Sequence, residues 1–157
     1  IITFGELVNF YDFFSKEYDL KNESKNVFIF REIVKLRNAV AHNTCILCYL
    51  DKKDQNYTAD YKVIKYLNNC NIKKETRDNK LSNSRIRQIT YTLYMFNEIV
   101  TSMGIKLNVT KDINKLFYER IILHKDYYNN NELLKSIYLY FDKIIKKYYD
   151  MEIDKIV

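Results

Sequence analysis

Apolar residues recur at three- and four-residue intervals along most of the chain, which is the spacing of one face of an α-helix. The pattern predicts a first helix over residues 3–20, with Thr3 as its N-cap and Glu6 as the capping-box partner. A second helix is predicted from about residue 25 to about residue 48, with Ser24 as its cap. Each of these helices has one apolar face that is available for burial.

The remaining chain continues the helical pattern with one long interruption. Residues 51–58 are polar and loop-like, and residues 61–67 fit a short helix. Residues 68–84 contain almost no apolar side chain and predict a mobile basic loop. Three further helices are predicted over residues 85–102, ended by Gly104, then from Thr110 to about residue 122, and over residues 133–148. The sequence thus predicts an all-α bundle of about five helices with a basic loop between helices, forming a single domain over residues 1–157.

The composition narrows the possible function classes. The chain has 157 residues, enough for one domain with a real core, but it has no proline and only two glycines, Gly5 and Gly104. So few glycines exclude a glycine-rich phosphate-binding loop, and the shortage of turn residues argues against a β-sandwich or barrel. Lys and Arg outnumber Asp and Glu by 26 to 20, a net charge of +6 that is compatible with a nucleic-acid partner.

The cysteines and the ends of the chain bear on location. Three cysteines, Cys45, Cys48 and Cys70, are too few for a disulfide framework and favour a reducing cytosol. The sequence has no signal-peptide pattern and no apolar stretch near the ~20 residues of a membrane span, so we expect a cytoplasmic protein with no membrane partner. Because the chain begins at Ile1 without methionine, we expect a fragment that lacks an N-terminal region.

The second predicted helix carries one residue that does not suit burial. Its core-facing stripe runs through Val27, Phe30, Val34, Arg37, Ala41, Cys45 and Cys48. A buried guanidinium is costly unless an anion meets it, and two interpretations remain open. Arg37 either pairs with Glu32 or another carboxylate inside the fold, or it faces an anion or a partner surface. The two cysteines share this stripe, so we expect their thiols to be buried and not to hold a metal.

A histidine and an amide lie close to Arg37. His42 follows five residues later, about 140° around an ideal helix, so that the two side chains flank a groove. Asn38 is four residues before His42, within reach to orient its imidazole. An imidazole, a fixed cation and an orienting amide are the parts needed to cleave RNA by attack of the 2′-hydroxyl, with no metal or cofactor. The alternative is an ordinary histidine at a helix end.

Residues 37–43, Arg-Asn-Ala-Val-Ala-His-Asn, resemble the Arg-Asn-x-x-x-His signature of the HEPN superfamily. Together with residues 2–7 and Leu36, they resemble the C-terminal half of the Abi family of bacterial abortive-infection (phage-resistance) proteins. The resemblance is carried by the first third of the chain, and the remainder is similar only in being helical. Members of the family are longer than this chain, which agrees with the expected absence of an N-terminal region.

The resemblance implies a HEPN-like helical bundle that pairs about a two-fold axis and places both copies of the motif in one cleft. It implies a metal-independent endoribonuclease of a phage-defence or toxin–antitoxin system, in which Arg37 and His42 are catalytic and Asn38 is supportive. A homodimer supplies the second His42 that a general acid requires. Because some superfamily members are inactive, the alternative is a non-catalytic module that holds a non-coding RNA or neutralises a toxin partner.

A second candidate for RNA contact is the basic segment. It consists of Lys73, Lys74, Arg77, Lys80, Arg85 and Arg87. Such a segment fits the sugar-phosphate backbone of RNA, with affinity that falls as salt rises. The alternative is a solvated loop that maintains solubility. Tyrosines could stack on bases, but Tyr91, Tyr94, Tyr138 and Tyr148 lie on helical stripes and are expected in the core.

Overall fold

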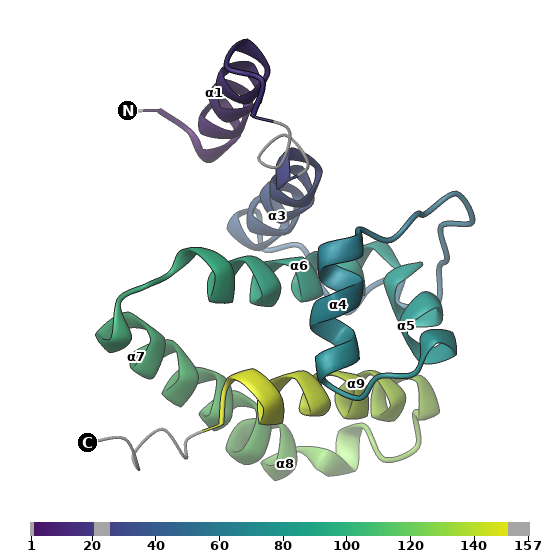
Figure 1. Ribbon diagram of the computed structural model, residues 1–157. Coiled ribbons are helices and arrows are strands. Elements are labelled where there is room, and N and C mark those ends of the chain that lie inside the picture. Colours follow the sequence, from purple (N-terminus) through teal and green to yellow (C-terminus); the bar gives the residue numbers. More distant parts are fainter. Residues whose placement is uncertain (1, 21–25, 151–157) are drawn as a thin grey trace.

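The computed structural model describes residues 2–20 and 26–150, and every regular element in this part of the chain is helical (Figure 1). The α-helices are α1 (Phe4–Glu17), α3 (Asn26–Ala41), α4 (Tyr61–Asn69), α5 (Lys74–Leu81), α6 (Ser84–Ile99), α7 (Met103–Asn114), α8 (Ile121–Leu123) and α9 (Glu132–Tyr148). A π-helical segment, Lys115–Arg120, joins α7 to α8, and a short 3₁₀ turn, Lys125–Tyr127, follows α8. The predicted all-α fold is confirmed.

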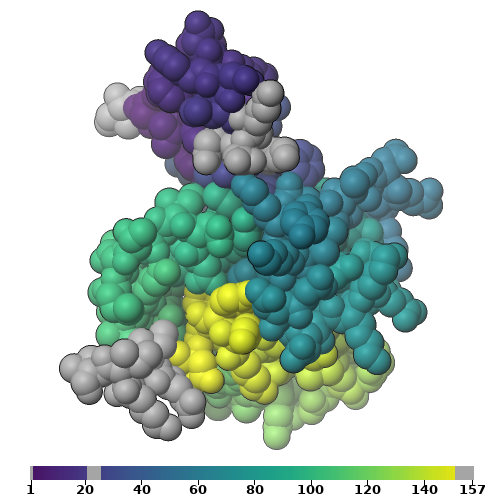
Figure 2. All heavy atoms as spheres, in the orientation of Figure 1, coloured from purple at the N-terminus to yellow at the C-terminus, as the bar shows by residue number. Residues whose placement is uncertain are grey.

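The helices form a main body with a two-helix extension (Figure 1). Helices α4 and α5 pack on α6, while α3 packs on another part of α6 and α1 packs in turn on α3. Consequently α1 lies at the outer end of the molecule, which the space-filling view also shows (Figure 2). The core lies in the main body, and its fully buried side chains include Leu67, Leu81, Ile86, Tyr91 and Ile144.

The first helix begins as its sequence predicts. The Thr3 hydroxyl accepts a hydrogen bond from the Glu6 backbone N–H at 3.2 Å, and the Glu6 carboxylate accepts one from the Thr3 N–H at 2.7 Å. The second of these bonds is the main reason why the pKa of the Glu6 carboxyl is lowered. Only Val8 and Ser15 of α1 are buried, because α3 covers just one side of the helix. An apolar face therefore remains exposed, comprising Leu7, Phe10, Phe13, Phe14 and Tyr18.

Helix α3 ends earlier than the predicted boundary near residue 48. Asn43 adopts a left-handed conformation with φ of 52°, which asparagine tolerates better than most residues. The Thr44 N–H bonds the Ala39 carbonyl at 2.8 Å and the Asn43 N–H bonds the Val40 carbonyl at 3.0 Å. These two bonds form a Schellman motif, and they make His42 the C-cap of α3. The start of this helix is defined from Asn26 onward, and the Ser24 cap lies outside the described residues.

Two other predicted boundaries are wrong. Gly104 does not end a helix, because α6 stops at Ile99 and Gly104 lies in the first turn of α7. The chain leaves α6 at Val100, which is extended and sits among β-branched residues that lower helix propensity. Thr110, the expected N-cap of the next helix, is buried in the interior of α7. The tyrosine prediction holds best on α6, where Tyr91 and Tyr94 are buried, whereas Tyr138 and Tyr148 on α9 are half-buried.

A buried ion pair joins α3 to α6. Glu32 is 2% exposed and Arg87 is 5% exposed, and Oε2 of Glu32 lies 3.6 Å from Nε of Arg87. Lys35 donates to Oε1 of Glu32 at 2.5 Å from the solvent side, and Gln88 donates to Oε2 at 3.4 Å. Asp54 provides a second carboxylate, 3.6 Å from Nη2 of Arg87. These contacts fix how α3 is rotated on the main body.

Among the helices that the structure describes, none combines the length and the apolar character needed to cross a bilayer.

We expect Glu32→Ala to lower the free energy of unfolding by about 3 kcal/mol or more, because it leaves the Arg87 guanidinium buried without its carboxylate. Urea unfolding followed by far-ultraviolet circular dichroism measures this change. The control is Glu119→Ala, an exposed position where the expected change is within about 0.5 kcal/mol. Similar losses for the two variants would contradict the structural role of Glu32.

Candidate functional site

The C-terminal end of α3 presents the three residues of the predicted catalytic motif to solvent. Arg37, Asn38 and His42 are all exposed. Helix α3 packs along α6, where Ile29 joins the core and Glu32 meets Arg87, and the residues of the motif at its other end are exposed. The Schellman motif stops the helix directly after His42, so the histidine stays next to the last turn of the helix.

Arg37 is paired with an amide and not with a carboxylate. Its Nη1 donates to the side-chain oxygen of Asn38 at 3.0 Å. Within the described part of the chain no carboxylate lies at ion-pairing distance from Arg37, and Glu32 is instead occupied by Lys35 and Arg87. Of the two interpretations left open by the sequence, an internal Arg37–Glu32 pair is therefore wrong. The guanidinium keeps an uncompensated positive charge at the surface.

Asn38 connects the two catalytic candidates, but in a different way from the prediction. Its side-chain oxygen holds Arg37, and its backbone carbonyl accepts the His42 N–H at 3.0 Å. The expected contact between the Asn38 amide and the imidazole is absent from the hydrogen bonds of the described residues. Asn38 thus positions the cation through its side chain, and it positions the histidine through the backbone.

Several apolar side chains next to the motif in the sequence are exposed. Val40 is 57% exposed and Leu47 is 53% exposed, and Ile46 and Tyr49 are also exposed. Large apolar groups that gather around polar residues on a surface are typical of an interaction site. The surface around Arg37 and His42 is therefore different from an ordinary solvated helix end.

The two cysteines after His42 are exposed, so the prediction that their thiols are buried on the core stripe is wrong. The reason is the early end of α3, which takes residues 45–48 off the helical stripe. A hydrogen bond from the Leu47 backbone, followed by one from the Cys48 thiol, lowers the pKa of Cys45. The same thiol–thiol contact raises the pKa of Cys48, and burial raises the pKa of Cys70 to about 12.

The basic segment is not a mobile loop, because its residues form α5 and the first turn of α6. Arg77, Lys80 and Arg87 are buried, and we correct the prediction that these three form a basic loop along the RNA phosphates. Arg77 donates to the side-chain oxygen of Asn68. Burial lowers the pKa of Lys80, and the neighbouring Lys53 lowers it further. The alkyl stems of such side chains fill space that apolar residues occupy elsewhere, which explains a helix with so few apolar residues.

The other three basic residues of the segment remain accessible. Lys73 and Lys74 are exposed at the start of α5, where Lys74 pairs with Asp78 at 3.0 Å. Arg85 is half-buried at the start of α6 and donates to the side-chain oxygen of Gln88 at 2.9 Å. Only this half of the predicted RNA-binding set is therefore accessible on the outer surface, where it can meet the phosphates of a nucleic acid.

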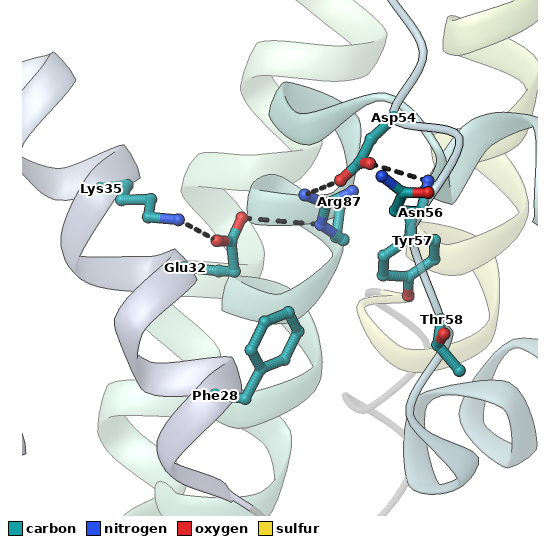
Figure 3. Close-up of a pocket in the computed structure, with 8 residues that line it drawn as sticks. All are labelled: Phe28, Glu32, Lys35, Asp54, Asn56, Tyr57, Thr58 and Arg87. Atoms are coloured by element: carbon teal, nitrogen blue, oxygen red, sulfur yellow. Dashed lines mark hydrogen bonds and ion pairs between the residues drawn. The ribbon is translucent and has the colours of Figure 1, made fainter.

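The sequence interpretation missed a pocket between α3, α6 and the segment 54–58 (Figure 3). Its volume is about 430 Å³, and Glu32, Arg87, Asp54 and Tyr57 are among the residues that line it. One signal in the sequence points to it. Glu32 stands in the apolar run of the second predicted helix, where a carboxylate needs a buried cation. The cation, Arg87, is too far along the chain for spacing to identify.

The cysteines provide a direct test of the geometry next to His42. We expect brief treatment with iodoacetamide near neutral pH to modify Cys45 before Cys48, because the thiolate is the reactive form and the pKa of Cys45 is lowered. Cys70 stays unmodified in the folded protein because it is buried. Peptide mass spectrometry over a time course measures the order. Early modification of Cys70, or of Cys48 ahead of Cys45, contradicts the described turn.

Comparison of the chain with family models, with curated proteins and with solved structures finds no match.

Proposed function

We propose that this protein is a metal-independent endoribonuclease of the HEPN type, which cleaves RNA as part of a bacterial abortive-infection system. The observation that carries the proposal is the state of Arg37. It is exposed, its described partner is a neutral amide, and it stands at the same helix end as His42. A cation held in this way is free to meet a phosphate.

The chemistry follows from the two side chains. His42, in its neutral form, accepts the proton of a ribose 2′-hydroxyl, whose oxygen then attacks the adjacent phosphorus. Arg37 stabilises the negative charge that develops on the phosphate oxygens, so the reaction uses no metal ion. The 5′-oxygen leaves with a proton from a general acid, and the products carry a 2′,3′-cyclic phosphate and a 5′-hydroxyl. Asn38 is a positioning residue that holds the guanidinium in place.

The general acid comes from a second copy of the chain in this proposal. One imidazole cannot hold the base and acid positions on opposite sides of the phosphorus at once, and the other histidine, His124, lies near Tyr127 on a different part of the fold. A two-fold dimer brings a second Arg37 and His42 to the same cleft. The exposed side chains of Val40, Ile46, Leu47 and Tyr49 supply an apolar surface for this contact.

The accessible basic residues fit the same function. Lys73, Lys74 and Arg85 are the members of the basic segment that can reach RNA phosphates outside the cleavage site. The free cysteines of the described chain suit a reducing cytosol, where the proposed RNA substrates are found.

The central test compares the two histidines of the chain. His42→Ala should lower the rate of RNA cleavage in the presence of EDTA by about 100-fold or more, since general base catalysis contributes at least that factor. His124→Ala is the matched control and should retain the wild-type rate, because His124 is also exposed but lies away from the motif. Equal cleavage rates for the two variants exclude the mechanism. If an RNA or a toxin co-purifies tightly with the protein and substrate RNA is not cleaved, the result favours a non-catalytic module.

Arg37 gives a second, independent readout. Arg37→Lys keeps the charge but removes the planar fork, so we expect a loss of kcat of about tenfold or more with little change in the oligomeric state. Unchanged kcat contradicts the role of the guanidinium as the phosphate clamp. Cleavage of a defined RNA, quantified under single-turnover conditions, measures the effect.

The dimer is tested at Leu47. The wild-type protein should have a solution mass near twice the 19.1 kDa of one chain, whereas Leu47→Glu should shift it to the monomer and abolish cleavage. Light scattering after size-exclusion chromatography measures the mass, and Leu139→Glu on α9 is the control at another exposed leucine. A wild-type monomer that cleaves RNA with the same His42 dependence refutes the composite site.

A further inference from the structure

The pocket beside α3 has the size and the lining of a small-molecule site. Its volume of about 430 Å³ falls within the range of ligand pockets, roughly 300–1,000 Å³. Figure 3 shows Arg87 lying between Glu32 on the α3 side and Asp54 with Tyr57 on the opposite side. Phe28, Lys35, Asn56 and Thr58 complete the lining.

The floor of the pocket holds a buried guanidinium whose hydrogen-bonding capacity is only partly used. Nη1 of Arg87 donates to the Leu81 carbonyl at 3.0 Å, while Nη2 lies 3.6 Å from Asp54. Nε is buried without a hydrogen-bond partner, since its 3.6 Å separation from Glu32 is too long for one. Nη2 is the nitrogen that points toward Asp54, and their 3.6 Å separation is too long for a hydrogen bond. An acceptor atom of a ligand between these two pocket residues can meet this donor.

Two aromatic rings give the pocket flat walls. The Arg87 guanidinium lies over the Tyr57 ring at 4.4 Å from its centroid. Phe28 is 49% exposed. Its ring packs edge-on against the buried Tyr91, with 6.3 Å between the two ring centroids. Aromatic rings and guanidinium planes are the surfaces on which proteins stack the bases of single-stranded RNA.

The charges in the pocket favour a neutral ligand with a defined edge. Lys35 and Arg87 balance Glu32 and Asp54, so the lining has no net charge to attract a phosphate. Arg87 supplies donors next to the half-exposed carboxylate of Asp54, which is an acceptor. A carbonyl beside a ring N–H matches this pair, and guanine and uracil have that edge. Adenine and cytosine present an amino group where the guanidinium requires an acceptor.

The pocket and His42 lie along one line of α3, whereas Arg37 is on the other side of the helix. Phe28, Lys35 and His42 are seven residues apart, so each is only about 20° from the preceding one around the helix. His42 still belongs to this path, because its N–H bonds the Asn38 carbonyl in the helical pattern. At about 1.5 Å per residue, His42 is roughly 10 Å beyond Lys35 along the axis. One RNA strand is long enough to occupy both places.

We propose that this pocket is a base-specificity subsite, which binds guanine or uracil of an RNA strand whose backbone runs along α3 toward His42. The proposal rests on the proposed ribonuclease function for its biological meaning, but the pocket itself is defined by α3, α6 and the segment 54–58. Arg87 and Asp54 select the keto edge, the exposed ring of Phe28 holds the plane of the base, and Lys35 lies on the path toward His42.

The experiment uses the full chain with His42→Ala, which removes cleavage and leaves every pocket residue in place. Each of the four nucleoside 5′-monophosphates is titrated while the amide resonances of residues 54–58 are followed by NMR. We expect GMP and UMP to bind with Kd values at least about tenfold lower than those of AMP and CMP, the low end of the discrimination expected from paired base contacts.

Two pocket variants and one control complete the test. Asp54→Asn, which removes the charged acceptor, should reduce the discrimination to about threefold or less, and Asp51→Asn, at an exposed carboxylate outside the pocket, should leave it unchanged. Phe28→Leu keeps an apolar contact for Tyr91 but removes the aromatic ring, so it should weaken the binding of all four nucleotides by a similar factor. If Asp54→Asn unfolds, Phe28→Leu decides alone. Equal Kd values for the four nucleotides, or binding that Phe28→Leu does not weaken, overturn the proposal.

The two proposals fail separately. Nucleotide binding is measured without cleavage, so a wild-type protein that cuts no RNA but binds GMP and UMP selectively overturns only the ribonuclease. His42-dependent cleavage with no base preference, together with equal nucleotide affinities, overturns only the subsite.

Discussion

The buried pair of Glu32 and Arg87 determines which residues of α3 face the solvent. Both charges are removed from water, and each is costly to bury without the other. Because Glu32 must face α6, the rotation of α3 about its own axis is fixed. Arg37 follows five residues later, about 140° around the helix, so the same constraint that buries Glu32 turns Arg37 outward. An electrostatic requirement of the core thereby presents the cation of the candidate site.

The end of α3 is the second constraint on the site. Asn43 has a left-handed backbone conformation and closes the Schellman motif. This motif ends the helix directly after His42. His42 becomes the cap residue at the end of the helix, five residues beyond Arg37. The following residues leave the helix, which exposes Leu47 and the two cysteines together.

The sequence predicted the features that local periodicity determines. The all-α fold, the Thr3–Glu6 capping box and the burial of Tyr91 follow from spacing and cap chemistry. Helix α5 could not be found in the same way, because Leu81 is the one apolar side chain that it buries. Its other buried side chains are those of Arg77 and Lys80, which a hydropathy pattern counts as exposed. Residue spacing alone could not decide whether Arg37 is exposed. Its exposure depends on the pairing of Glu32 with Arg87, which is fifty-five residues further along the chain.

The contrast between Arg37 and Arg87 explains why net charge alone is a poor guide to function here. Both belong to sequence stretches that attract attention as phosphate-binding candidates. Arg87 lies between two carboxylates inside the fold, and its charge is cancelled within the pocket. Arg37 has only an amide beside it in the described structure, and its charge extends into solvent. The former can select a neutral base through directed hydrogen bonds, and the latter can meet a phosphate. In the proposed function one RNA strand supplies both groups, and the two arginines bind it by different physical means.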